Sequence, residues 1–180
     1  MLLKANFELM ADYNQWMNKS IYLAASKLSA DELSKERGAF FGSIIGILNH
    51  IFVGDTIWLK RFADHPSELK ALNSIRALEK PKSLDAILYH EFRDLESARI
   101  RMDDVIQEFA HELTGEVLAS SLSYSNTKGE QFNKNLGHLI QHFFNHQTHH
   151  RGQVTTLLSQ AGIDAGVTDL LIGIADEKTV

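Results

Sequence analysis

The chain has 180 residues, a formal net charge of −5 and no cysteine, but it carries nine histidines. The missing cysteine excludes disulfide scaffolds, cysteine-based zinc fingers, iron–sulfur clusters and catalysis by a protein thiol. The acidic balance comes without a basic patch of the kind that replaces counterions on phosphate, so we expect no nucleic-acid partner.

Few prolines and long runs of helix-forming residues predict an all-α chain that folds as one domain over residues 1–180. The first helix is expected over residues 3–28, and the N-terminus lacks the basic-then-apolar order of a signal peptide. Ser29 and Glu32 predict a capping box for a short helix that ends at Gly38. Because no apolar run approaches the roughly 18 residues of a membrane span, we expect a cytoplasmic protein without a membrane partner.

The second long helix is predicted from Ser43, as its N-cap, to Ala63. It is apolar around most of its circumference, which is typical of a helix buried on more than one side. A polar connection with one weak helical turn then reaches Pro81. A third, highly charged helix with a narrower apolar stripe is predicted from Ser83 to Leu113.

Between residues 114 and 134 apolar and polar side chains alternate around a turn at residues 126–129. This pattern predicts a short two-stranded hairpin or an extended loop. The last long helix is predicted from Asn135 to Ala161, with Gly162 as its C-terminal left-handed residue. Four long helices favour a four-helix bundle as the simplest packing.

Five of the nine histidines lie on this last helix: His138, His142, His146, His149 and His150. Residues four apart share a helix face, so two imidazoles at that spacing can bind one metal ion. At about 100° per residue, His150 lies about 30° and His146 about 70° from the centre of the apolar face, and the other three lie beyond about 100°. Because metal sites in bundles use inward-facing residues, helical phase selects His146 and His150.

A metal site needs a further protein ligand, which without cysteine is a histidine or a carboxylate. The candidates on the second long helix are His50 and Asp55, and helical phase does not decide between them. Asp55 lies near the centre of an apolar stripe, where a carboxylate needs a partner. It is explained equally well as one half of a structural ion pair with an arginine. The alternative to the whole site is a set of incidental histidines.

Two segments resemble the DinB/YfiT-like superfamily of metalloenzymes. They are residues 144–154, FNHQTHHRGQV, and residues 48–62, LNHIFVGDTIWLKRF. Gly162 and the Thr-Asp-Leu run at residues 168–170 fit the same family. Together with the chain length and the helix order, the resemblance covers nearly the whole sequence, so residues 1–180 are expected to form a single DinB-like domain.

The resemblance implies an antiparallel four-helix bundle, often a homodimer, that holds a divalent metal ion, commonly nickel or zinc. It implies three histidine ligands, which correspond here to His50, His146 and His150. Characterised relatives are metal-dependent transferases or isomerases that use low-molecular-weight thiols, and some of them have a carboxylate where this chain has an imidazole. The family name refers to induction by DNA damage, from which a stress-response role is expected.

The sequence therefore predicts a metal-dependent enzyme, either thiol S-transferase-like or hydrolase-like. A three-histidine site can lower the pKa of bound water to about 7, or bind a thiol as its thiolate. Asp55, Arg151 and Gln153 are candidates to support the ligands, since ligating imidazoles usually donate their other N–H; for Arg151 a structural salt bridge is the alternative. No unambiguous general base stands beside the three histidines, which leaves open the alternative function of a non-catalytic, metal-stabilised stress-response or small-molecule-binding protein.

Overall fold

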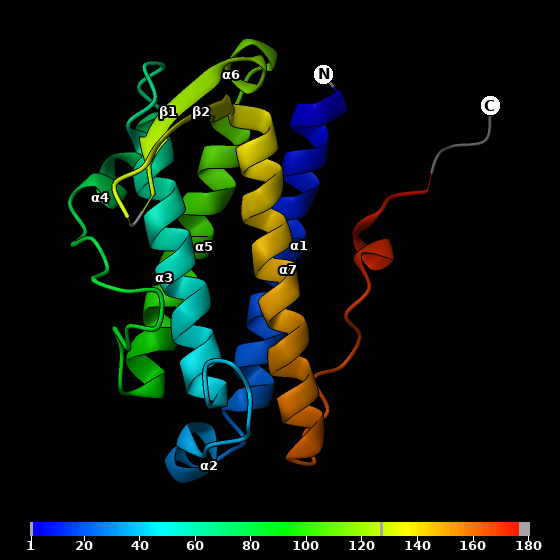
Figure 1. The fold of residues 1–180 in the computed structure, drawn as a ribbon. Helices are drawn as coiled ribbons and strands as arrows, with labels where there is room; N and C mark the ends of the chain where they lie inside the picture. Colours follow the sequence, from blue (N-terminus) through cyan, green and yellow to red (C-terminus); the bar gives the residue numbers. More distant parts are fainter. Residues whose placement is uncertain (1, 127, 177–180) are drawn as a thin grey trace.

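The computed structural model describes residues 2–126 and 128–176, which form a mostly helical protein with a small two-stranded sheet (Figure 1). The four longest helices are α1 (Leu2–Ala25), α3 (Ile44–Ala63), α5 (Phe92–Glu112) and α7 (Leu136–Gln160). The shorter elements are α2 (Ala30–Ser34), η1 (Lys70–Leu72), α4 (Asn73–Arg76), α6 (Gly115–Ala119), β1 (Ser121–Ser125), β2 (Gln131–Asn135) and η2 (Leu170–Gly173). The predicted helical class is confirmed. None of the helices in the described ranges is long and apolar enough to cross a membrane.

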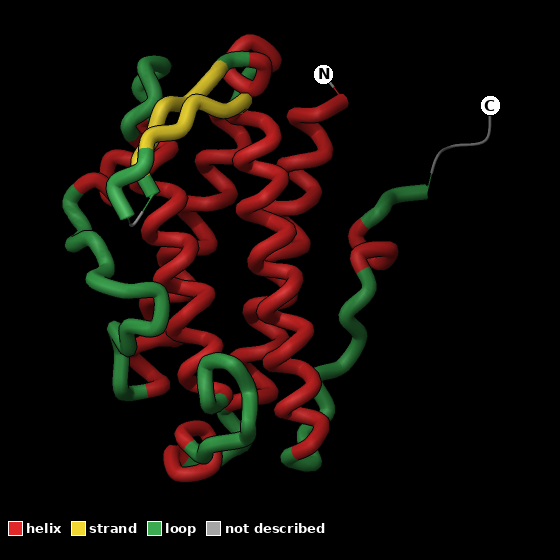
Figure 2. The backbone as a smooth tube through the Cα atoms, viewed as in Figure 1, coloured by secondary structure: helices red, strands yellow, loops and turns green. Residues whose placement is uncertain are grey.

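The long helices lie side by side, with α1 packed on α5 and α7, and α3 packed on α7 and α5. Helix α1 runs opposite to α5, because Lys4 bonds to the His111 carbonyl while Asn14 bonds to Asp103. Helices α3 and α7 also run in opposite directions, whereas the pairs α1/α7 and α3/α5 each run in one direction (Figure 1). The two parallel pairs arise because residues 64–91 carry the chain back along α3 before α5 begins (Figure 2).

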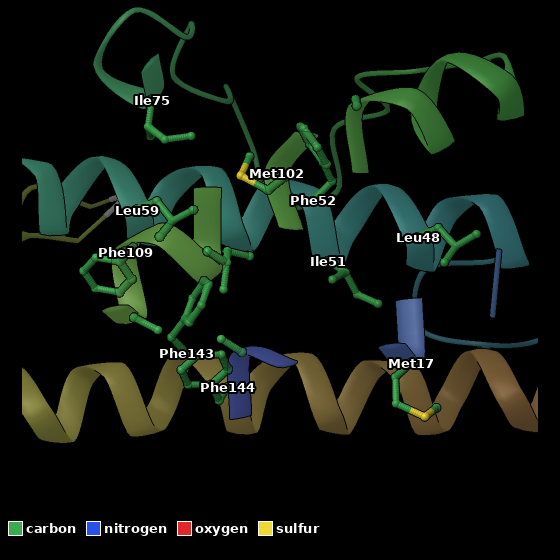
Figure 3. Close-up of a cluster of buried hydrophobic side chains, with 14 of the residues drawn as sticks. Met17, Leu48, Ile51, Phe52, Leu59, Ile75, Met102, Phe109, Phe143 and Phe144 are labelled. Atoms are coloured by element: carbon green, nitrogen blue, oxygen red, sulfur yellow. The ribbon is translucent and has the colours of Figure 1, made fainter. Parts of the chain in front are cut away.

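Buried apolar side chains fill the space between the four long helices. Figure 3 shows Leu59, Phe109 and Phe143 among them, contributed by α3, α5 and α7. Phe62 stacks on Phe109 and meets Phe143 edge-on, with ring centroids 5.6 and 5.9 Å apart. Such aromatic pairs add about 0.5–1.5 kcal/mol each to the free energy of burial.

Side-chain caps begin three helices, and two of the cap residues, Ser29 and Ser43, are those that the sequence predicts. Ser29, Ser43 and Asn135 each accept a hydrogen bond from the amide three residues further on. The reciprocal half of the predicted capping box is wrong, because the Glu32 carboxylate pairs with Arg37 and does not return to Ser29. The predicted hairpin is present as β1 and β2, which pair antiparallel, and α6 precedes it without having been predicted.

The third long helix begins at Phe92 and not, as predicted, at Ser83. The residues between them are irregular because a tertiary contact competes with the helix. The buried Asn49 side chain accepts from the amides of Leu88 and Tyr89 and donates to the Tyr89 carbonyl. These bonds satisfy backbone groups that a helix would otherwise have paired, and they hold the segment across α3.

Candidate metal centre

Three histidine side chains converge between α3 and α7. His50 comes from the second turn of α3, and His146 and His150 lie one turn apart on α7. The Nε2 atom of His50 lies 3.2 Å from Nε2 of His146 and 3.1 Å from Nε2 of His150. Within the described residues, no other group of three or more His, Asp or Glu side chains converges in this way. We call these three residues the histidine centre.

The spacing of the ring nitrogens suits a single metal ion. Nitrogen ligands about 2.0–2.1 Å from a metal lie about 2.9–3.4 Å apart when the angles between the bonds are about 90–110°. The two Nε2 separations of 3.1 and 3.2 Å fall in this interval. Three imidazoles also form a donor set that zinc, copper, iron and nickel accept. The residues present therefore fit a divalent transition metal.

Hydrogen bonds at the far side of two rings direct their lone pairs into the centre. His50 Nδ1 donates to the Leu84 carbonyl at 2.7 Å, and His150 Nδ1 donates to Gln153 Oε1 at 2.8 Å. A neutral imidazole has one N–H, so both Nε2 atoms are acceptors. Two acceptors 3.1 Å apart repel each other, and a cation between them turns this repulsion into attraction.

Burial keeps the three imidazoles neutral. It lowers the pKa of His50 and of His150, and it lowers the pKa of His146 to about 3, with a smaller effect from repulsion by the neighbouring histidines. Only the neutral ring offers a lone pair to a metal. The centre is consequently in its ligand form at neutral pH.

Three neighbours that the sequence analysis did not select shape the centre. Phe41 lies flat on the His50 ring, with centroids 3.6 Å apart and planes inclined by 17°. A Cβ atom at Gly54 would lie 2.7 Å from Cε1 of His146, so only glycine lets that ring approach α3 so closely. Leu84 supplies its carbonyl from the irregular segment before α5. Of these three, only Gly54 carried a signal in the sequence, because a glycine inside an apolar helix indicates a close approach.

Of the three residues predicted to support the ligands, Gln153 is the one that bonds to a histidine of the centre. Asp55 lies fully buried in α3, but its two carboxylate oxygens accept from Arg99 and Gln147. Its neighbours therefore match the structural ion pair that the sequence left as an equal alternative. Burial raises the pKa of Asp55, and the attraction of Arg99 partly opposes that effect.

Arg151 also faces away from the histidine centre. It donates to Asn14 on α1, and its guanidinium lies 5.4 Å from the centre of the Tyr13 ring. No ion pair joins it to Asp55, which takes Arg99 from α5 as its partner. The three histidines predicted to face outward are exposed, namely His138, His142 and His149.

Two comparisons place these residues in a wider set of proteins. The model of the DinB family matches residues 1–177 of the chain. Protein DinB of Bacillus subtilis (strain 168) is 27% identical over 168 residues, which cover 93% of each of the two chains. All three histidines of the centre lie inside the family match.

Proposed function

Because the chain belongs to the DinB family, we propose that it binds one divalent metal ion, nickel or zinc, through His50, His146 and His150. The observation that carries this proposal is the pair of Nε2 acceptors on His50 and His150 that face each other at 3.1 Å. Packing of α3 against α7, in a four-helix bundle of the DinB type, brings the ligands together.

We further propose that the protein is a metal-dependent enzyme, thiol S-transferase-like or hydrolase-like. A divalent ion supplies a Lewis acid that lowers the pKa of a coordinated water or thiol. Three protein ligands leave room for a substrate atom. Since the chain has no cysteine, a thiol would come from a low-molecular-weight molecule. Phe41 covers one face of His50 and excludes water there.

A second candidate is a non-catalytic, metal-stabilised protein that binds a small molecule or serves in a stress response. One observation favours it: Asp55, the carboxylate nearest to His50 along α3, is bonded to Arg99 and Gln147 and is not free to act as a base. For either function we propose a cytoplasmic homodimer. Sedimentation velocity tests the dimer, because it measures the mass of the particle.

Metal analysis of protein purified without a histidine tag tests the proposal directly. We expect about one nickel or zinc ion per chain, and its loss in His150→Ala. His138→Ala is the matched control, because His138 is an exposed histidine on the same helix, and we expect it to keep the metal. A wild-type protein without metal, whose melting temperature is unchanged by added nickel and zinc, would contradict metal binding.

Turnover separates the two candidate functions. The activities of metal-loaded and metal-stripped protein are compared, first on small thiols together with electrophiles and then on esters. The enzyme proposal expects turnover that disappears when the metal is removed and returns when it is restored. Metal binding without turnover favours the binding protein, and turnover that survives metal removal contradicts the metal-dependent mechanism.

A further inference from the structure

A groove of about 520 Å³ lies beside the histidine centre, and residues of α3, α7 and the β1–β2 hairpin line it. Its lining consists of Trp58, Tyr124, Lys134, Asn135, His138, Leu139 and His142. None of these residues is acidic, although the chain as a whole carries a net charge of −5. The groove is therefore a local exception to the acidic balance of the protein.

Arg61 borders this groove and is held in a fixed position. Its guanidinium lies 4.5 Å from the centre of the Trp58 ring and 4.9 Å from that of Tyr124. One of its nitrogens donates to the Ser125 carbonyl at 3.1 Å. In the described part of the chain, no carboxylate lies within ion-pair distance of Arg61. A fixed cation without a counter-charge can bind an anion at little cost in side-chain entropy.

Two more positive groups lie at the same groove. Lys134 is part of its lining, with the ammonium 5.2 Å from the centre of the Phe132 ring. The amino end of α7, which begins at Leu136 next to Asn135, adds the positive end of a helix dipole. Because Arg61 already lies over both aromatic rings, a second cation finds no favourable place there. The charges select an anion.

The groove begins one helical turn from the histidine centre. His142 precedes His146 by one turn on α7, and their ring centroids are 6.2 Å apart. Trp58 follows Gly54 by one turn on α3, and the Trp58 and His142 rings meet across the two helices at 5.1 Å. With a rise of 1.5 Å per residue, Arg61 lies about 10–17 Å along α3 from the level of Gly54 and His50, which one small molecule can span.

We infer that this groove binds the anionic, ring-bearing end of the substrate, an arene carboxylate or a similar oxyanion, whose other end reacts at the metal. This inference rests on the proposed metal-dependent function. Arg61 and Lys134 bind the oxyanion. Trp58 and Tyr124, which are half-buried and line the groove, pack against the planar ring, as aromatic rings prefer to meet edge-to-face or offset.

Fluorescence of Trp58 tests the inference with simple probes. The chain has two tryptophans, so Trp16→Phe leaves Trp58 as the sole emitter. We expect benzoate to change its emission with saturation at millimolar concentration. We expect benzamide, the same ring without charge, to bind at least about tenfold more weakly, and acetate, which has no ring, to be weaker still. Equal affinity for benzoate and benzamide, or no saturable change, would overturn the inference.

A pair of arginine variants locates the binding site. Arg61→Gln is expected to weaken benzoate binding about tenfold and to leave benzamide unchanged, because it removes the charge and keeps a polar side chain. Arg101→Gln, at an exposed position of α5, is the matched control and should bind benzoate as the parent does. The same loss in both variants would contradict a local site.

Metal content, measured on the same preparations, distinguishes this inference from the proposed function. Arg61→Gln should keep about one metal ion per chain, since Arg61 makes no contact with the histidine centre. Selective benzoate binding to a protein that holds no metal would support the groove as an anion site and overturn its link to a metal reaction. A metal-loaded protein that ignores benzoate would leave the metal function standing and overturn the groove.

Discussion

Two polar clusters lie next to each other among the long helices, and their donors and acceptors are arranged differently. The first cluster is the histidine centre. The second cluster, the charged layer, consists of Asn14, Asn18, Asp55, Arg99, Asp103, Gln147 and Arg151. In the charged layer donors meet acceptors: Asp55 accepts from Arg99, and Asp103 accepts from both Asn14 and Asn18. In the histidine centre, the Nε2 acceptors of His50 and His150 face each other.

The difference separates a structural role from a binding role. The charged layer holds two aspartates and two arginines, so its formal charges cancel within the chain. Burial still raises the pKa of Asp103 to about 6, against the attraction of Arg99, which shows how much desolvation those pairs must offset. The histidine centre has no such internal compensation. These contacts indicate that the layer holds α1, α3, α5 and α7 in place, and the contrast supports the proposal that the histidine centre binds a ligand from outside the chain.

Replacing Arg99 by methionine gives the largest effect that this comparison predicts. The change keeps most of the side-chain volume but leaves Asp55 and Asp103 buried without their cation. We expect the free energy of unfolding of metal-free protein to fall by about 3–5 kcal/mol, measured by urea denaturation. Arg101→Met, at an exposed position of the same helix, should stay within about 0.5 kcal/mol of the wild type.

The metal affinity of Arg99→Met should stay within about twofold of the wild type. A variant that kept its stability and lost its metal would reverse the comparison, because the charged layer would then serve the site and not the fold.

Replacing Gly54 by alanine gives an intermediate effect, and only on the centre. The added methyl group would overlap the His146 ring, which must turn away from its two partners. We expect metal affinity to fall about thirtyfold, or about 2 kcal/mol, in a competition titration with a chromogenic chelator. Stability without metal should not fall, because alanine favours a helix over glycine by about 1 kcal/mol.

Gly152→Ala supplies the control for this experiment. It lies on α7 beside the ligands, and nothing lies within 4 Å of the added methyl group. It should gain the same helix propensity and keep the wild-type metal affinity. Equal affinity of Gly54→Ala and Gly152→Ala for metal would show that the close approach of His146 to α3 does not matter.

The long helices are predictable where local chemistry decides them. Ser43 caps α3 as predicted and α7 begins next to Asn135 as predicted, because a side-chain oxygen next to free amides needs no tertiary contact. The start of α5 was not predictable in this way. Its upstream residues are held by Asn49, which lies far away in the sequence, and no periodicity within the segment shows that contact.

The residues of the histidine centre also differ in whether local sequence patterns predict them. Helical phase selected His146 and His150, because both lie on one helix whose apolar face the sequence shows. His50 needed the family resemblance, since α3 is apolar nearly all round and phase has little meaning there. Phe41 and the Leu84 carbonyl escaped both approaches, because they lie on irregular segments that only the folded chain brings to the rings.

Gln153 offers the finest test, because it acts on a ligand through a single hydrogen bond. Its Oε1 accepts from His150 Nδ1, and this bond directs the Nε2 lone pair toward His50. Gln153→Leu removes the acceptor and keeps a side chain of similar volume, and we expect metal affinity to fall about tenfold. Gln153→Glu keeps an acceptor with a negative charge, makes the imidazole more basic, and should bind metal at least as tightly as the wild type. Chelator competition measures all three proteins; equal affinity of the leucine variant and the wild type would mean that His150 is oriented by packing against Phe41 and not by its hydrogen bond.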